Sequence, residues 1–129
     1  MATDSSAAPG PLLWRITDRR TFAALRREGR RARVDGIGCT WLAPAPDAGA
    51  APPKVALAIT RTAGGAVIRN RIRRRVRAAL RELRTTGDLP GGSYLVTAGP
   101  EARTQPWSDL VTTLREVVAT VTADRRARA

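Results

Sequence analysis

Seven arginines and one asparagine stand within the twenty residues from Gly64 to Leu83, and phosphate binding is the chemistry that these residue types favour. Turned at 100° per residue, the segment becomes a helix with an apolar stripe about a third of its circumference wide. The stripe comprises Ile68, Ile72, Val76, Ala79, Leu80 and Leu83, and an adjacent face comprises Asn70, Arg73, Arg74, Arg77, Arg81 and Arg84. Repulsion between like charges three or four residues apart costs about 0.2 to 0.5 kcal/mol per pair. A solvated charged face would mix signs, whereas Glu82 is the only acid in the segment. We therefore expect a polyanionic partner.

The composition of the whole chain favours the same class of partner. Twenty-three basic residues against eleven acidic ones give the 129-residue chain a net charge of +12 and an isoelectric point near 11.8. Such an excess is typical of proteins that bind nucleic acids or anionic surfaces. Every basic residue except Lys54 is an arginine, and the planar guanidinium can pair with phosphate and stack on bases. The composition therefore indicates nucleic-acid binding.

Catalysis by the protein itself is not expected from these residues. A protein nuclease needs a general base or carboxylates clustered around metal ions, whereas the chain has no histidine and its eleven acids are scattered. Four aspartates could still meet in space, namely Asp18, Asp35, Asp88 and Asp109. Isolated acids at the ends of elements more often serve as helix caps or solvated charges. The sequence therefore predicts no catalytic residue, no metal site and no cofactor in the protein.

Length and cysteine usage indicate one domain in a reducing compartment. A chain of 129 residues allows a single core, and the lone Cys39 excludes an internal disulfide and fits a cytoplasmic protein. The sequence has neither the apolar run of a membrane span nor that of a signal peptide. We expect a flexible leader over residues 1–13, a single RNA-binding domain over 14–123 and a basic, frayed tail over 124–129.

Apolar periodicity places the basic helix within the order helix, strand, strand, helix, strand, helix. The expected elements are a helix capped by Thr17 and ending at Gly29, a strand around Cys39, strands at 54–60 and 93–97 on either side of the basic helix, and a final amphipathic helix at 107–123. This order predicts an α+β fold, a small sandwich of helices against a short sheet. The strand, helix, strand connection would ordinarily be right-handed.

The stretch ITRTAGGAVIRNRIRRRVRAALREL, from Ile59 to Leu83, resembles the signature segment of the bacterial ribonuclease P protein component. That signature runs as a strand, two basic residues, a Gly-Asn-Ala-Val turn, Arg-Asn-Arg, a hydrophobic residue, Lys-Arg, two residues and Arg. The matching residues are Ala66, Val67, Arg69, Asn70, Arg71, Ile72, Arg74 and Arg77, with Arg61 at the first basic position. Arg73 replaces the usual Lys, Thr62 the second basic residue and Gly65 the Asn. Weaker similarity extends over most of the remaining chain.

The resemblance implies a helper of RNA catalysis. In the family, a catalytic RNA holds the metal ions and hydrolyses the 5′ leader from precursor tRNA, while the small protein binds the RNA and the leader. The chain would then be a non-catalytic subunit of an endoribonuclease, and Mg²⁺ would be bound by the partner RNA. The resemblance also implies a fold like that of ribosomal protein S5 domain 2, with a left-handed crossover around the basic helix.

Two sets of site residues follow from the resemblance. The set for the catalytic RNA is Arg61, Arg69, Asn70, Arg71, Arg73, Arg74, Arg77 and Arg81, and the set for the single-stranded leader, between the first helix and the sheet, is Phe22, Arg26, Thr40 and Trp41. Arg26 and Thr40 stand where the family has aromatic residues. Phe22, Trp41 and Tyr94 could stack on bases, but each could equally belong to the core. Asn70 could contact RNA or order its own helix turn.

Two other functions fit part of the sequence. A general binding protein for structured RNA or for the ribosome would use the same basic helix without stimulating cleavage. A protein-only hydrolase is disfavoured by the absence of histidine and the scattered acids. No motif indicates a protein partner or a membrane.

Overall fold

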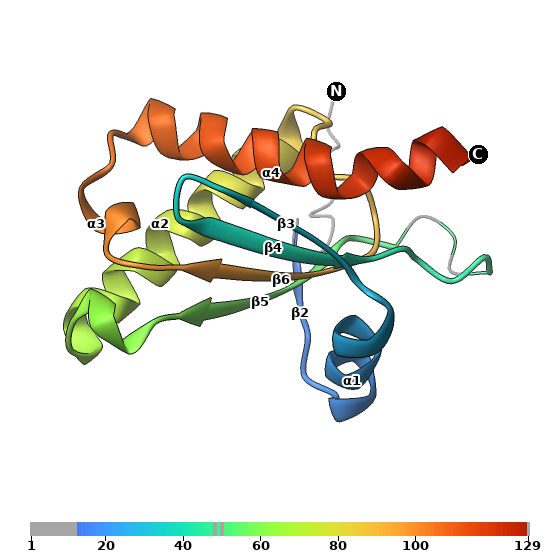
Figure 1. Cartoon of the computed structure of the whole chain (residues 1–129), viewed down its shortest axis with the longest axis horizontal. Helices are drawn as coiled ribbons and strands as arrows, with labels where there is room; N and C mark the ends of the chain where they lie inside the picture. The colour runs from blue at the N-terminus through green and yellow to red at the C-terminus, as the bar shows by residue number, and fades with distance from the viewer. Residues whose placement is uncertain (1–12, 48, 50, 129) are drawn as a thin grey trace, which may run out of the picture.

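The computed structural model describes residues 13–47, 49 and 51–128, the last five by their backbone alone. Its centre is a mixed sheet in the order β2-β5-β6-β4-β3 (Figure 1). The strands are β2 (Trp14–Arg15), β3 (Arg30–Val34), β4 (Ile37–Leu42), β5 (Lys54–Ile59) and β6 (Ser93–Ala98). β2, β5 and β6 are parallel, and β4 runs antiparallel to both β6 and β3. The predicted α+β class is confirmed.

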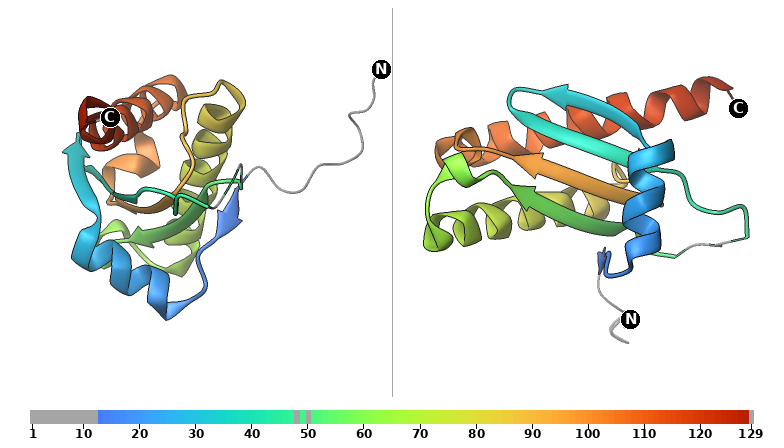
Figure 2. Two further views of the ribbon diagram at one scale, coloured as in Figure 1. Left: turned by 90° about the vertical axis from the view of Figure 1, so that its right-hand side faces the viewer. Right: turned by 60° about the horizontal axis from the view of Figure 1, so that its bottom comes forward.

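Helices cover both faces of this sheet. They are α1 (Arg19–Glu28), the short 3₁₀ helix η1 (Arg61–Ala63), α2 (Ala66–Thr85), α3 (Glu101–Thr104) and α4 (Trp107–Arg128). α2 and α4 pack together on one face, and α1 crosses the other (Figures 1 and 2). The parallel neighbours β5 and β6 are connected through α2, which lies on the same face of the sheet as α4. This position makes the β5–α2–β6 crossover left-handed, as the resemblance implies and against the general rule.

The core lies between the sheet and the pair α2 and α4. Alternate residues of β5 and β6 face it, so Val55, Tyr94 and Val96 are fully buried. The apolar stripes predicted for the two long helices are buried here: Ile72, Val76, Ala79, Leu80 and Leu83 of α2, and Leu110, Leu114, Val117, Val118 and Val121 of α4. Burial of these stripes fixes which face of α2 remains outside.

Two strands were absent from the expected order. β3 forms a hairpin with β4 in which Val34 pairs with Ile37, and Asp35 and Gly36 both have positive φ, at 46° and 80°. This is the geometry of a two-residue primed turn, for which Asp-Gly is a favoured sequence. β3 was missed because three of its five residues are arginines, which mask the alternation of apolar and polar residues. β2 was missed because two residues are too few to show an alternation.

Two boundaries also differ from the sequence-based expectation. α1 is capped by Asp18, whose carboxylate accepts from the Thr21 backbone N–H at 2.9 Å, and not by Thr17. α4 continues to Arg128, beyond the expected end at 123, because the alanines and arginines of the tail are good helix formers. The predicted flexible leader lies outside the described residues except for Leu13, which is buried.

Candidate nucleic-acid interface

The outer face of α2 carries unneutralised positive charge. Arg71, Arg73, Arg74 and Arg81 are exposed, and Arg69 and Arg77 are half-buried beside the apolar stripe. Ion pairs within the described part of the chain join Arg27 to Glu28 and Arg115 to Asp88 and involve no arginine of α2. The predicted RNA-binding residues of this helix are therefore brought together on one surface, and Arg61 is exposed on η1 just before it.

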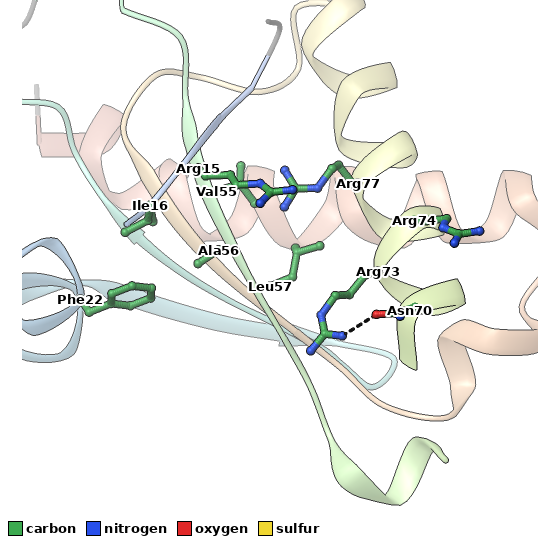
Figure 3. Close-up of a pocket in the computed structure, with 10 residues that line it drawn as sticks. All are labelled: Arg15, Ile16, Phe22, Val55, Ala56, Leu57, Asn70, Arg73, Arg74 and Arg77. Atoms are coloured by element: carbon green, nitrogen blue, oxygen red, sulfur yellow. Dashed lines mark hydrogen bonds between the residues drawn. The ribbon is translucent and has the colours of Figure 1, made fainter. Parts of the chain in front are cut away.

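A groove of about 500 Å³ runs between α2 and the edge of the sheet, and we call it the arginine groove. Figure 3 shows the residues that line it: Arg15, Ile16, Phe22, Val55, Ala56, Leu57, Asn70, Arg73, Arg74 and Arg77. Because β2 is only two residues long, β5 is uncovered beyond Val55, which opens the groove. Its floor is apolar and its α2 wall is basic.

Arg15 and Arg77 converge in this groove (Figure 3). The pKa of the Arg77 guanidinium is lowered, first by burial and then by the positive charges of Arg15 and Arg81. A cation held against other cations is stabilised by an anion. Arg15 was not among the predicted site residues, because only the pairing of Arg15 with Val55 places it opposite α2.

Asn70 positions one of the groove arginines. Its Oδ1 accepts a hydrogen bond from Nη1 of Arg73 at 3.1 Å (Figure 3). The alternative considered from sequence, a bond from Asn70 to local backbone, is not the contact found. Asn70 therefore restricts the Arg73 guanidinium, which lowers the entropy cost of a phosphate contact.

Arg75 belongs to the basic run in sequence but not to this surface. Its Nη1 donates to the carbonyl oxygens of Ala102 and Arg103 at 2.6 and 3.2 Å, and its Nη2 donates to that of Gln105 at 2.6 Å. These carbonyls end α3, where helical partners run out. Arg75 thus ties α2 to α3.

The α1 side of the sheet holds a second hollow of about 500 Å³ over β3, β4 and β6, which we call the β4 hollow. Thr40 lines it together with Arg31, Arg33 and Leu95. Arg26 is exposed in the last turn of α1. These placements bring Thr40 to the face that α1 crosses.

Trp41 does not reach that face. Its side chain is 5% exposed, packs against the Tyr94 ring with centroids 6.4 Å apart, and donates through Nε1 to the Gly91 carbonyl at 3.1 Å. Trp41 pairs with Tyr94 across the sheet, so both point into the core. Placing Trp41 in the leader set was therefore a wrong choice of strand face, whereas Phe22 lines the arginine groove.

The four aspartates that could have met in space do not form one cluster. Asp18 caps α1, and Asp88 accepts from Arg115 at 3.1 Å. Asp35 and Asp109 share a small hollow with Glu116. Within the described residues, no group of three or more histidine, cysteine, aspartate or glutamate side chains is arranged to hold a metal ion.

The fold and these surfaces define a small α+β protein with a basic groove along one helix. The family model described as Ribonuclease P matches residues 12–122. The chain belongs to the ribonuclease P protein component family, which confirms the resemblance seen in the sequence.

Over the aligned segments, relatives in this family are identical to the chain at about a third of positions. It is 36% identical over 116 residues to the ribonuclease P protein component of Thermobifida fusca, covering 86% of this chain and 78% of the relative. It is also 36% identical over 111 residues to that of Thermus thermophilus, covering 86% of this chain and 60% of the relative. Membership implies a role in tRNA processing, as part of an endoribonuclease and in partnership with the ribonuclease P RNA.

Solved structures show the same fold. The RNase P protein from Staphylococcus aureus superposes with a TM-score of 0.67 at 17% identity, over 84% of this chain and 96% of that one. The RNase P protein from Thermotoga maritima gives a TM-score of 0.64 at 20% identity, over 83% of this chain and 96% of that one. Among the described helices, none combines the length and the apolarity that crossing a bilayer requires.

Proposed function

We propose that this chain binds the catalytic RNA of ribonuclease P through the outer face of α2 and the arginine groove, and so assists RNA-catalysed removal of the 5′ leader from precursor tRNA. The observation that carries the proposal is the convergence of Arg15 and Arg77, with no carboxylate among the residues that line the groove. RNA phosphates supply the missing negative charge.

The leader lies on the α1 side of the sheet. Phe22 offers a half-buried ring for stacking, and Arg26 offers a guanidinium where a second aromatic would stand. Thr40, Arg31 and the neighbouring β4 hollow continue this surface. Stacking on bases and contacts to sugar and phosphate both tolerate different leader sequences.

The chemistry belongs to the RNA. Hydrolysis of a phosphodiester needs metal-bound or base-activated water, and this chain supplies cations and no such base. Mg²⁺ is coordinated by RNA oxygens, and the arginines screen the repulsion between catalytic RNA and precursor. The protein therefore stimulates cleavage most strongly at low Mg²⁺ concentration. We place this activity in the cytoplasm, where tRNA matures.

Reconstitution at low Mg²⁺ tests the proposal. Catalytic RNA and precursor tRNA are mixed with wild-type protein, with Arg73→Ala, with Arg77→Ala, or with the matched control Arg115→Ala, whose guanidinium already pairs with Asp88. We expect stimulation by wild type and the control, and weaker stimulation by the two α2 variants. If six α2 arginines neutralise phosphates, the logarithm of the binding constant falls with the logarithm of salt concentration with a slope of roughly 4 to 5.

Three other outcomes would overturn the proposal in different ways. Tight RNA binding without stimulation would indicate a general RNA-binding protein. Cleavage by the protein without RNA would indicate a hydrolase. Equal stimulation by Arg73→Ala, Arg77→Ala and wild type would mean that α2 is not the RNA surface.

A further inference from the structure

A third hollow, of about 330 Å³, lies where β5 and β6 begin and is used by neither proposed RNA surface. We call it the Trp14 hollow, because the Trp14 side chain forms one wall and is 40% exposed. Its volume falls at the lower end of the range for small-ligand pockets.

Backbone pairing holds Trp14 in this position. Its N–H donates to the Pro53 carbonyl at 2.9 Å, and Ile16 N–H donates to the Val55 carbonyl at 3.2 Å. Trp14 pairs with Lys54 in the parallel register of β2 and β5, so both side chains lie on the α1 side. The ring is thus fixed by strand geometry while one part of its surface stays in solvent.

The hollow is lined by two cations and by mostly apolar walls. Arg20, in the first turn of α1, and Lys54 line it, and none of the described residues around it is acidic. Asp18 lies outside the lining but close enough to Lys54 for their charges to interact, and its oxygens accept from the N–H and hydroxyl of Thr21 at 2.8 to 2.9 Å. Its charge offsets part of that of Lys54 and leaves Arg20 as the second cation. The remaining walls include Ala24, Leu42, Pro44, Pro52, Gly91 and Gly92.

We propose that the Trp14 hollow takes one base of single-stranded leader RNA, stacked on the Trp14 ring, with the flanking phosphates at Arg20 and Lys54. An exposed aromatic beside cations is the general arrangement for binding single strands. The inference rests on the proposed function, because the strand is the leader. Trp14 and Lys54 line the hollow, and Ile16 and Ala56, two residues further along the same chain segments, line the arginine groove beside Phe22, so a leader that passes Phe22 reaches the hollow next.

The chain offers a matched control. Trp107, at the start of α4, is 44% exposed but lies away from the Trp14 hollow. Affinities of Trp14→Leu and Trp107→Leu are measured with fluorescently labelled single-stranded leader oligonucleotides of increasing length and with the catalytic RNA alone. Because stacking contributes roughly 1 to 3 kcal/mol per base, we expect Trp14→Leu to weaken long-leader binding about 5-fold or more. Binding of catalytic RNA, and all binding by Trp107→Leu, stays unchanged.

Three further measurements make the assignment specific. Trp14→Phe keeps a ring and restores part of the lost affinity. Arg20→Gln lowers the salt slope for the leader by about 1, as expected for one lost phosphate contact. Leaders carrying 4-thiouridine are photo-crosslinked to wild-type protein, and we expect the crosslinked peptide to contain Trp14.

The outcomes separate this inference from the proposed function. Unchanged leader affinity in a folded Trp14→Leu, or crosslinks that never include the Trp14 peptide, overturns the hollow as a base site while wild type still stimulates cleavage. A wild-type protein that neither stimulates cleavage nor binds catalytic RNA overturns the proposed function itself. If Trp14→Leu fails to fold, the wild-type crosslink decides alone.

Discussion

Replacing Arg75 by alanine should damage the fold and spare the RNA surface, although the sequence shows it as one arginine among seven. The side chain is partly buried and makes three bonds to carbonyl oxygens at the end of α3, two of them at 2.6 Å in partly buried surroundings. A hydrogen bond from a charged donor contributes about 1.5 to 3 kcal/mol. Counting only the two short bonds at the lower value gives a loss of about 3 kcal/mol.

That loss is a large part of a typical domain stability of about 5 to 15 kcal/mol. For a chain of this size it corresponds to a fall in Tm of roughly 12 °C, taking about 4 °C per kcal/mol. Urea denaturation followed by circular dichroism measures the free energy directly. Arg75→Lys keeps the charge but loses the planar fork, so we expect it to recover less than half of the stability.

Arg71→Ala is the matched control, because Arg71 lies on the same helix and is exposed. It should leave the unfolding free energy within about 0.5 kcal/mol of wild type and weaken RNA binding. Arg75→Ala should do the reverse, with RNA affinity within about twofold at a temperature where it is folded. The reasoning is refuted if Arg75→Ala is as stable as wild type, or if it loses as much RNA affinity as Arg73→Ala.

Three shorter predictions concern other sites. Burial raises the pKa of the Cys39 thiol to about 12, so native protein should resist alkylation at pH 8 and react after denaturation, as followed by mass spectrometry; rapid native labelling would contradict its burial. Hydrogen bonds from Thr86 and then Arg115 lower the pKa of Asp88 below 3.8, so its contribution to stability is complete above about pH 4 and is lost as pH falls through the folded pKa. The stability gap to Asp88→Asn, measured by denaturation, should shrink on acidification, and a constant gap would argue against it. Gly92→Ala should cost about 2 kcal/mol or more of unfolding free energy, because φ is 122° and a Cβ would lie 2.5 Å from a carbonyl oxygen of β4; a variant of wild-type stability would contradict that strain.

The long helices were predictable because their signal is local. A period of 3.6 residues repeats over several turns in α2 and α4, so the buried stripe can be read from the sequence. The family could be recognised for a related reason, since its motif is one contiguous segment from Arg61 to Arg77. Neither inference needs any knowledge of which distant residues meet.

The strand face of Trp41 could not be predicted in the same way. Alternation shows that Cys39 and Trp41 share one side of β4, but both sides of this sheet are covered by helices. Pairing of Trp41 with Tyr94, and of Cys39 with Val96, decides that this side is the core. A two-sided sheet therefore leaves the choice between core and binding surface to tertiary packing.

The sequence by itself determined that this protein has a basic helix, a family and a small α+β fold, because charge, periodicity and a contiguous motif are properties of neighbouring residues. The tertiary structure alone decided what the individual arginines do. A two-residue strand brings Arg15 from the N-terminal region to face Arg77, while the packing of α3 withdraws Arg75 from the surface. Contacts between residues far apart in the chain cost loop entropy and are specified by the packing of the whole core. They therefore cannot be predicted from a local sequence pattern.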